Sequence, residues 1–187
     1  MTFMLTTRRL VLEDLTLRDF DDLLRMAQDE RVMQYLMVWL ENEDQVNAFV
    51  QHAIDESQRN DRADYLLAIR IAKTGEFAGV TFIEIDPREP STAEIGCILL
   101  PDFWKAGYAT EILRTLLAFS FDVLRLHRVY GKCDEQNTPS ARSLENGGLK
   151  YEGTLREHVW LRDHWRSTKY YGMLAEEYFQ RPRTAEE

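Results

Sequence analysis

The sequence predicts a single α/β (α+β) domain in which a mixed β-sheet is flanked by helices. The chain has 187 residues, 44% of them hydrophobic, which is enough for one core. Segments with the alternation of strands are interleaved with segments of helical periodicity. A strand, a turn and a helix follow one another directly across residues 93–124. We expect the domain to cover residues 1–180 and residues 181–187 to form a frayed tail.

The N-terminal third predicts one strand followed by two helices. Residues 8–16 (RRLVLEDLT) alternate apolar and polar side chains, and Thr16 followed by Asp19 resembles a helix-starting cap. Apolar residues then recur at helical spacing over residues 17–27 and again from about residue 44 to 57. The stretch VMQYLMVWL lies between the two helices.

The central third predicts a hairpin, a buried strand and a long helix. Residues 64–72 and 77–86 have strand composition and are joined by the turn sequence KTGE. Residues 93–100 (AEIGCILL) are almost continuously apolar, which suits a strand covered on both faces. The helix is expected to run from about Ala109 to Leu124.

The C-terminal third predicts three strands and a short helix. Strands are expected at residues 127–133, 151–161 and 167–175, with RDHWR connecting the last two. The short helix covers residues 140–148 and ends at a pair of glycines.

Composition limits the classes of partner. Apolar runs are broken by charge well short of the roughly 20 residues of a membrane span, and the first residues lack a signal-peptide pattern. We therefore expect a cytoplasmic protein with no membrane partner. Cys97 and Cys133 suggest no disulfide framework, and the four histidines show no ligand spacing, so no metal is predicted.

The formal net charge of −9 argues against nucleic acid as a partner, because neutralising phosphates requires clustered Lys and Arg. The same acidity also fits a protein that is merely kept soluble by its charge.

The turn within PDFWKAGYATEIL predicts an anion site. A helix that begins near Ala109 leaves its first amides without intrahelical partners, and the helix dipole adds positive potential there. Gly107 allows close approach of a ligand, Thr110 adds a hydroxyl donor, and Lys105 adds a positive charge. The alternative is an ordinary strand-to-helix turn with a packing glycine. The sequence contains neither a P-loop nor a dinucleotide fingerprint.

Two stretches in this order, AEIGCILLPDFWKAGYATEIL and CDEQNTPSARSLENGGLKYEG, resemble the GNAT superfamily of acyl-CoA-dependent N-acetyltransferases. Within it, the sequence is most similar to the RimJ/RimL branch of ribosomal-protein alanine and serine acetyltransferases. The resemblance runs from TTRRLVLEDLT to KYYGMLAEEY. It implies a mostly antiparallel sheet of about seven strands, splayed in the middle and flanked by helices.

The resemblance implies acetyl-CoA as the acyl donor. The pyrophosphate loop falls on residues 104–109, with the pantetheine arm paired along the preceding strand and contacted by an asparagine from the other side. The predicted donor-binding residues are Ile98, Leu99, Leu100, Lys105, Ala106, Gly107, Tyr108, Ala109, Thr110 and Asn137. This branch usually has glycine where this sequence has Lys105, and a positive φ there would cost a non-glycine residue about 1–2 kcal/mol.

The implied chemistry is direct attack of an amine on the acetyl thioester. A backbone N–H of the strand at residues 93–100 would stabilise the oxyanion. Ser140 would protonate the departing thiolate, although a serine there also fits a helix N-cap. Glu94 resembles the catalytic base of related enzymes and Glu84 is a second candidate, and each also fits an exposed strand carboxylate.

The acceptor is predicted from the cost of deprotonation. A Lys ε-amine of pKa about 10.4 costs roughly 4.6 kcal/mol to deprotonate at neutral pH, and an α-amine near 7.7 costs roughly 1 kcal/mol. Because no strong base stands out, a protein or peptide N-terminus is favoured, bound by Tyr35 and Trp39 unless these aromatics only pack.

Two other functions remain open at this point. One is an enzyme acting on a small amine such as a polyamine, amino sugar or antibiotic, and the other is a non-catalytic acyl-CoA-binding module. The resemblance and the aromatic C-terminal strand also suggest a homodimer.

Overall fold

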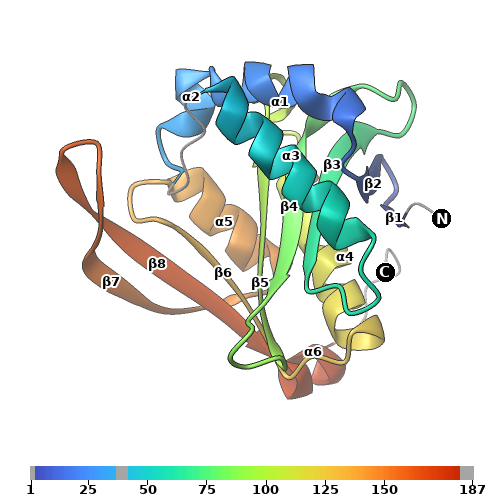
Figure 1. Cartoon of the computed structure of the whole chain (residues 1–187). Coiled ribbons are helices and arrows are strands. Elements are labelled where there is room, and N and C mark those ends of the chain that lie inside the picture. Colours follow the sequence, from blue (N-terminus) through green and yellow to red (C-terminus); the bar gives the residue numbers. More distant parts are fainter. Residues whose placement is uncertain (1–2, 37–41, 182–187) are drawn as a thin grey trace.

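The computed structural model describes residues 3–36 and 42–181 and confirms the predicted α/β class (Figure 1). One eight-stranded sheet has the order β1-β2-β3-β4-β5-β6-β8-β7, and every neighbouring pair is antiparallel except β5 and β6. The strands are β1 (Met4–Thr6), β2 (Leu10–Asp14), β3 (Asp64–Ile71), β4 (Phe77–Ile85), β5 (Thr92–Leu99), β6 (Arg128–Asp134), β7 (Lys150–Leu161) and β8 (His164–Leu174). The helices are α1 (Phe20–Ala27), α2 (Glu30–Met33), α3 (Glu43–Ser57), α4 (Tyr108–Ala118), α5 (Thr138–Gly147) and α6 (Ala175–Gln180).

Each face of the sheet is covered by its own core. Side chains alternate along a strand, so Leu66 and Ala68 of β3 enter one core while Leu67 and Ile69 enter the other. The first core packs against α1 and α3, and α3 lies in front of β3 and β4 in Figure 1. The second core packs against α4 and α5.

The sheet opens between β5 and β6. Only three residue pairs connect these parallel strands, at residues 92–94 of β5 and 128–130 of β6. Beyond them β5 stays paired with β4 and β6 stays paired with β8, and the two strands diverge upward from a common lower end in Figure 1. We call the unpaired stretch, residues 95–99 facing residues 131–134, the β5–β6 opening. The predicted splay is therefore present.

Several element boundaries differ from the prediction. The short strand β1 and the helices α2 and α6 were not predicted, since each is only three to six residues long. The connection between β7 and β8 is the dipeptide Arg162-Asp163 instead of RDHWR, with φ of 53° and 60°. Two positive φ values in a two-residue loop match the twist of a hairpin, and here no glycine supplies them. A five-residue π-helical turn (Phe119–Val123) follows α4.

Among the described residues, no helix is both long and apolar enough to cross a membrane.

Gly79 tests how closely β4 approaches β5. A Cβ atom at this position would lie 2.0 Å from the carbonyl oxygen of Ile98, which is a backbone atom that cannot turn aside. We expect Gly79→Ala to lower the free energy of unfolding by about 2–3 kcal/mol, the usual scale of overpacking. Gly75→Ala is the control, because both glycines have positive φ, so alanine strains the backbone at either position, but a Cβ at Gly75 meets nothing within 4 Å. Urea unfolding that shows equal losses for both variants would contradict this packing.

Candidate active site

The N-terminus of α4 presents free backbone donors at one side of the β5–β6 opening. After β5, residues Pro101–Phe103 form a 3-10 turn, and α4 begins at Tyr108 with Gly107 as its N-cap at φ 78°. No side chain caps this end. Within the described chain, the amides of residues 105–110 donate no hydrogen bond to the protein. Together with the helix dipole, they form a site suited to an anion such as phosphate.

Arg9 fixes the loop that leads into α4. Its Nη1 donates to the carbonyl of Ala106 at 2.9 Å, its Nε donates to Glu111 at 2.6 Å, and its guanidinium lies 4.4 Å from the centre of the Tyr108 ring. Burial raises the pKa of the Glu111 carboxyl, but hydrogen bonds from Thr7 and Arg9 outweigh it and hold this pKa below its ordinary value. Sequence reasoning did not predict Arg9, because no local pattern indicates a contact 102 residues away.

Lys105 has the left-handed backbone conformation that the sequence analysis considered for this position. Its φ is 60°, so a lysine occupies a position where glycine is favoured. The backbone is therefore strained at residue 105, and the lysine side chain is exposed.

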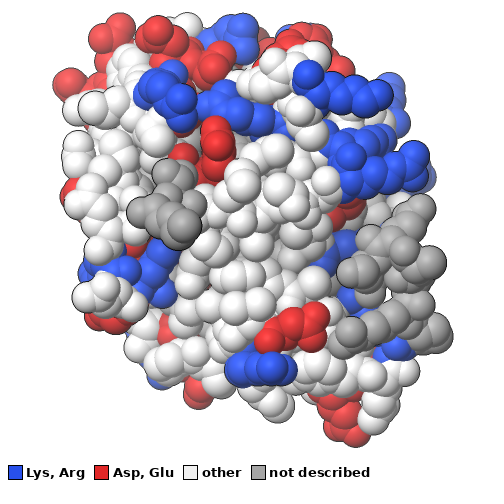
Figure 2. Space-filling model, turned by 90° about the vertical axis from the view of Figure 1, so that its right-hand side faces the viewer, with Lys and Arg blue, Asp and Glu red and all other residues white. Residues whose placement is uncertain are grey.

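Charge on the surface is uneven although the chain as a whole is acidic. Figure 2 shows one face on which Lys and Arg side chains form a band across the upper part, with Asp and Glu side chains along the top edge and a mostly uncharged centre. The net charge of −9 is therefore not spread evenly over the surface.

The edge of β5 supplies backbone groups to the opening. The N–H of Leu100 donates to the carbonyl of Ala78 at 2.9 Å, so the backbone N–H and C=O of Leu100 point toward β4. Backbone groups alternate along a strand, so those of Ile98 also face β4 while those of Cys97 and Leu99 face the opening. The indole of Trp104 donates to the Leu99 carbonyl at 2.7 Å. Of the three predicted strand residues, only Leu99 thus directs its backbone groups into the opening.

Asn137 and Ser140 lie on the other side of the opening, where β6 leads into α5. The Oδ1 atom of Asn137 accepts the N–H of Ser140 at 3.1 Å, so Asn137 is the N-cap of α5. The alternative interpretation of Ser140 as the N-cap is therefore wrong. Burial raises the pKa of the Cys133 thiol to about 11, and the Ser140 hydroxyl partly opposes this shift.

A polar row crosses the sheet on the face that carries α3. Asp64, Glu84 and Glu94 are direct cross-strand neighbours. Glu94 is buried, and its carboxylate lies 2.7 Å from the ammonium of Lys132. The Glu84 carboxylate makes no hydrogen bond or ion pair with the described residues. Desolvation, followed by the charges of Glu94 and Asp64, raises the pKa of the Glu84 carboxyl.

Of the two predicted bases, Glu94 is engaged in an ion pair and Glu84 is not. Lys132 is held beside Glu94: burial lowers the pKa of Lys132, but the Glu94 carboxylate outweighs it and raises this pKa above its ordinary value. Both roles remain predictions, and the geometry favours Glu84 as the carboxylate free to accept a proton.

The predicted acceptor residues are only partly described. Tyr35 is half-buried just after α2, and Trp39 lies outside the described residues. Near the β7–β8 turn, Trp165 is 54% exposed and meets Trp160 edge-to-face at 5.4 Å.

Across residues 3–36 and 42–181, no group of three or more His, Cys, Asp and Glu side chains is arranged to hold a metal ion.

A splayed sheet with an uncapped helix at the opening defines an α/β protein suited to hold a phosphate-bearing ligand along a strand edge. The chain belongs to the GNAT acetyltransferase family: residues 9–150 match the family model described as "Acetyltransferase (GNAT) domain". The predicted enzyme class, N-acetyltransferase, is thereby confirmed.

Relatives extend along nearly the whole chain. A Bacillus subtilis (strain 168) protein described as "Uncharacterized N-acetyltransferase YnaD" is 26% identical over 174 residues, which cover 93% of this chain and 98% of that protein. The structure of spermidine N-acetyltransferase from Vibrio cholerae, in complex with CoA and spermine, matches with a TM-score of 0.78 at 22% identity, covering 91% of this chain and 98% of that chain.

A Vibrio cholerae structure described as a proposed ribosomal-protein-serine acetyltransferase matches with a TM-score of 0.77 at 21% identity. It covers 92% of this chain and 97% of that chain. At these identities the two structures show a shared fold and leave the acceptor open.

Lys105 provides a test of the loop backbone. Lys105→Gly and Lys105→Ala remove the same ammonium, so they differ only in how easily residue 105 adopts φ 60°. We expect the glycine variant to be more stable than the alanine variant by about 1 kcal/mol in urea unfolding. An alanine variant as stable as the glycine variant would mean that the loop is not left-handed at this residue.

The raised pKa of the Glu84 carboxyl can be tested through the pH dependence of stability. Its pKa in the folded protein is raised above the ordinary 4.5, so the folded protein binds more protons than the unfolded chain between the two values. Stability is therefore lost as the pH rises through the folded-state pKa. We expect Glu84→Gln to raise Tm slightly at neutral pH, because the side chain is exposed and solvent screening weakens the repulsion that it relieves.

The gain should vanish below pH 4.5, where the wild-type carboxyl is protonated in both states. Glu76→Gln in the exposed β3–β4 turn is the control and should change Tm little at either pH. A Tm gain that does not depend on pH would show that the Glu84 charge is not its cause.

Proposed function

We propose that the protein is an acetyl-CoA-dependent N-acetyltransferase of the RimJ/RimL type, which transfers the acetyl group to the α-amine of a protein or peptide N-terminus. The observation that carries this proposal is the pairing of two features across one opening. Free amides of residues 105–110 lie on one side, and Asn137 and Ser140 lie on the other.

The opening fits the donor in three respects. The free amides at α4 suit a pyrophosphate, with Lys105 able to add charge. The N–H of Leu99 is available to pair with an extended amide-bearing arm, while its carbonyl already accepts the Trp104 indole; this would be recognition by strand addition. Because the Oδ1 of Asn137 is used as a cap, its Nδ2 amino group remains for such an arm.

The transfer forms one bond and breaks one bond. The neutral amine nitrogen attacks the thioester carbonyl carbon, the N–C bond forms, and the C–S bond breaks. The departing thiolate takes a proton from the Ser140 hydroxyl, and the proton lost by the amine passes to Glu84 directly or through water. Ser140 then regains a proton from water and Glu84 releases one to water, which restores both groups. No covalent intermediate on the protein is required.

The weakness of the available base supports an α-amine acceptor. Glu94 is occupied by Lys132, which leaves Glu84 as a carboxylate base whose pKa is raised from 4.5. Such a base suits an α-amine, whose deprotonation at neutral pH costs roughly 1 kcal/mol, better than a lysine ε-amine at roughly 4.6 kcal/mol.

A small polyamine is the second candidate acceptor. The row of Asp64, Glu84 and Glu94 places like charges directly opposite one another, an arrangement that a polycation would relieve. The fold is also shared with a spermidine N-acetyltransferase.

Thiol release from acetyl-CoA decides between these acceptors. The panel holds short peptides with free Ala or Ser N-termini, the same peptides N-terminally blocked but containing lysine, and simple polyamines. Turnover restricted to free N-termini supports the proposal, and turnover restricted to polyamines replaces it with the second candidate. Binding of acetyl-CoA without turnover of any amine would favour a non-catalytic acyl-CoA-binding module.

Ser140→Ala tests the proton donor. A positioned acid contributes about 10²–10⁴-fold, so we expect kcat to fall at least 100-fold while KM for acetyl-CoA changes little. Ser143→Ala on the same helix is the matched control, since its hydroxyl only donates to the Pro139 carbonyl at 3.0 Å. Equal rates for the two variants would remove Ser140 from the mechanism.

A further inference from the structure

A buried ion pair joins β8 to the end of β6. The Nε atom of Arg166 lies 2.7 Å from Asp134 Oδ2, and the two side chains are 9% and 3% exposed. The other carboxylate oxygen of Asp134 accepts the N–H of Gln136 at 2.8 Å, and its carbonyl accepts the N–H of Asn137 at 3.0 Å. One residue therefore shapes the turn that delivers Asn137 to the opening.

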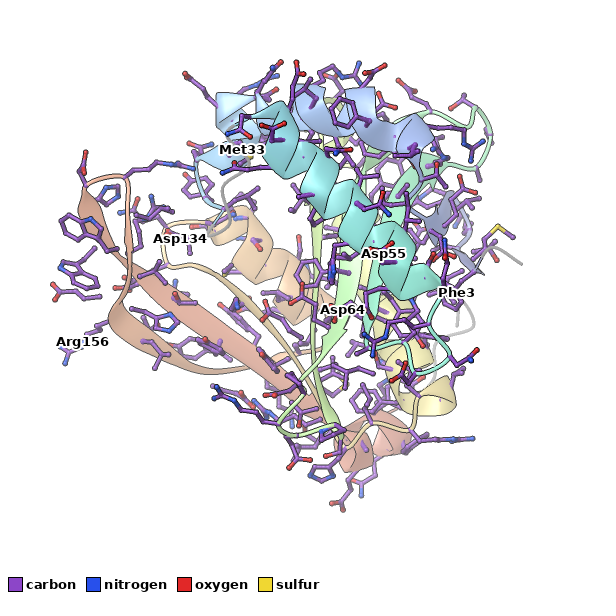
Figure 3. The ribbon with its side chains drawn as sticks, viewed as in Figure 1. Phe3, Met33, Asp55, Asp64, Asp134 and Arg156 are labelled. Atoms are coloured by element: carbon purple, nitrogen blue, oxygen red, sulfur yellow. The ribbon has the colours of Figure 1, made fainter. Side chains whose placement is uncertain are left out.

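The same arginine reaches the end of α2. Its Nη1 atom donates to the carbonyl of Gln34 at 3.4 Å, a long contact, and to the His164 ring at 3.2 Å. Arg162, in the β7–β8 turn, donates to the carbonyl of Met33. Figure 3 shows Met33 and Asp134 in the same upper region, between the β7–β8 hairpin and α3. The segment that these contacts hold leads directly into Tyr35.

His164 links Arg166 to Arg162 by hydrogen bonds. Arginine has no acceptor, so the His164 Nε2 atom must accept the hydrogen bond from Arg166. Its Nδ1 atom then carries the proton and donates to the carbonyl of Arg162 at 2.8 Å. Hydrogen bonds thus run from the end of α2 through the hairpin to the turn before α5.

We propose that Arg166 is a positioning residue that couples the acceptor-side segment at residues 33–36 to the turn carrying Asn137 and Ser140. The assignment of these two sides rests on the proposed function. The guanidinium reaches these acceptors from two separate nitrogens, Nε toward Asp134 and Nη1 toward His164 and Gln34, a spread that the one nitrogen of an ammonium does not have. Arg166 thereby fixes the separation between the acceptor site and the proton donor.

Stability alone does not account for this pair. A buried ion pair is often no more stabilising than well-packed apolar residues of similar volume. The chain also contains a second pair with the same chemistry, in which Arg62 lies 2.7 Å from Asp14 and each side chain is 8% exposed. Its remaining hydrogen bond goes from Nε to the Asp64 carbonyl, so the pair touches neither α2 nor the turn before α5. Arg62 is therefore a matched control for Arg166.

The experiment compares Arg166→Lys with Arg62→Lys. Both substitutions keep the charge and lose the planar fork. For Arg166→Lys we expect amide hydrogen exchange to accelerate roughly tenfold in residues 30–36 and 134–140 together, because each segment loses a tether. With the active acceptor, kcat/KM for the amine should fall roughly tenfold, while KM for acetyl-CoA changes less than about twofold. Arg62→Lys should produce neither change.

The inference is overturned if Arg166→Lys matches the wild type, if exchange rises in one segment only, or if Arg62→Lys gives the same pattern. If Arg166→Lys does not accumulate as folded protein, His164→Ala replaces it, since the histidine is exposed and its loss leaves the ion pair intact. For this variant, amide hydrogen exchange should again accelerate in both segments, but by less than tenfold. Failure of the wild type to acetylate any N-terminus would reject the proposed function, and the exchange data would still decide the role of Arg166.

Discussion

The candidate site depends on which partners the backbone N–H and C=O groups of β5 find beyond the point where β5 separates from β6. Three residue pairs hold the strands together, and beyond them Cys97 and Leu99 direct their backbone groups into the opening. Buried backbone N–H and C=O groups need hydrogen-bond partners, and those on an unpaired strand edge have none within the sheet. The Trp104 indole donates to the Leu99 carbonyl. An extended ligand that lies along the same edge can pair with the remaining groups.

The connection after each of the two strands places a helix N-terminus at the opening. The α4 end is left uncapped and presents free amides, whereas the α5 end is capped by Asn137 and presents the Ser140 hydroxyl. An uncapped end favours a ligand anion, and a capped end frees the next hydroxyl for chemistry. The two helix starts are thus specialised for different parts of one ligand. Arg9 and Arg166 fix the loops on the two sides through contacts with Ala106 and Asp134.

Local sequence patterns predicted the elements that carry the site, and long-range contacts supplied the rest. Gly107 before an apolar run predicted the start of α4, and the structure has it as the N-cap. The next helix was expected from residue 140, but α5 begins at Thr138 with Asn137 as its cap. The strand β1 was missed because three residues carry no readable alternation. The contacts of Arg9 with Glu111 and of Arg166 with Asp134 span 102 and 32 residues, so no spacing rule could indicate them. The cap assignment of Ser140 was open until the amide of Asn137 could be placed.

The most direct test of this account is calorimetric titration of the protein with acetyl-CoA and with acetylpantetheine, which has the same thioester arm without the pyrophosphate and its adenosine. If the free amides at α4 hold the pyrophosphate, acetyl-CoA should bind with 1:1 stoichiometry. Acetylpantetheine should then bind roughly 100-fold more weakly, the scale of two hydrogen bonds to a charged group. Equal affinities for the two ligands, or no binding of acetyl-CoA, would contradict the assignment of the β5–β6 opening as the donor site.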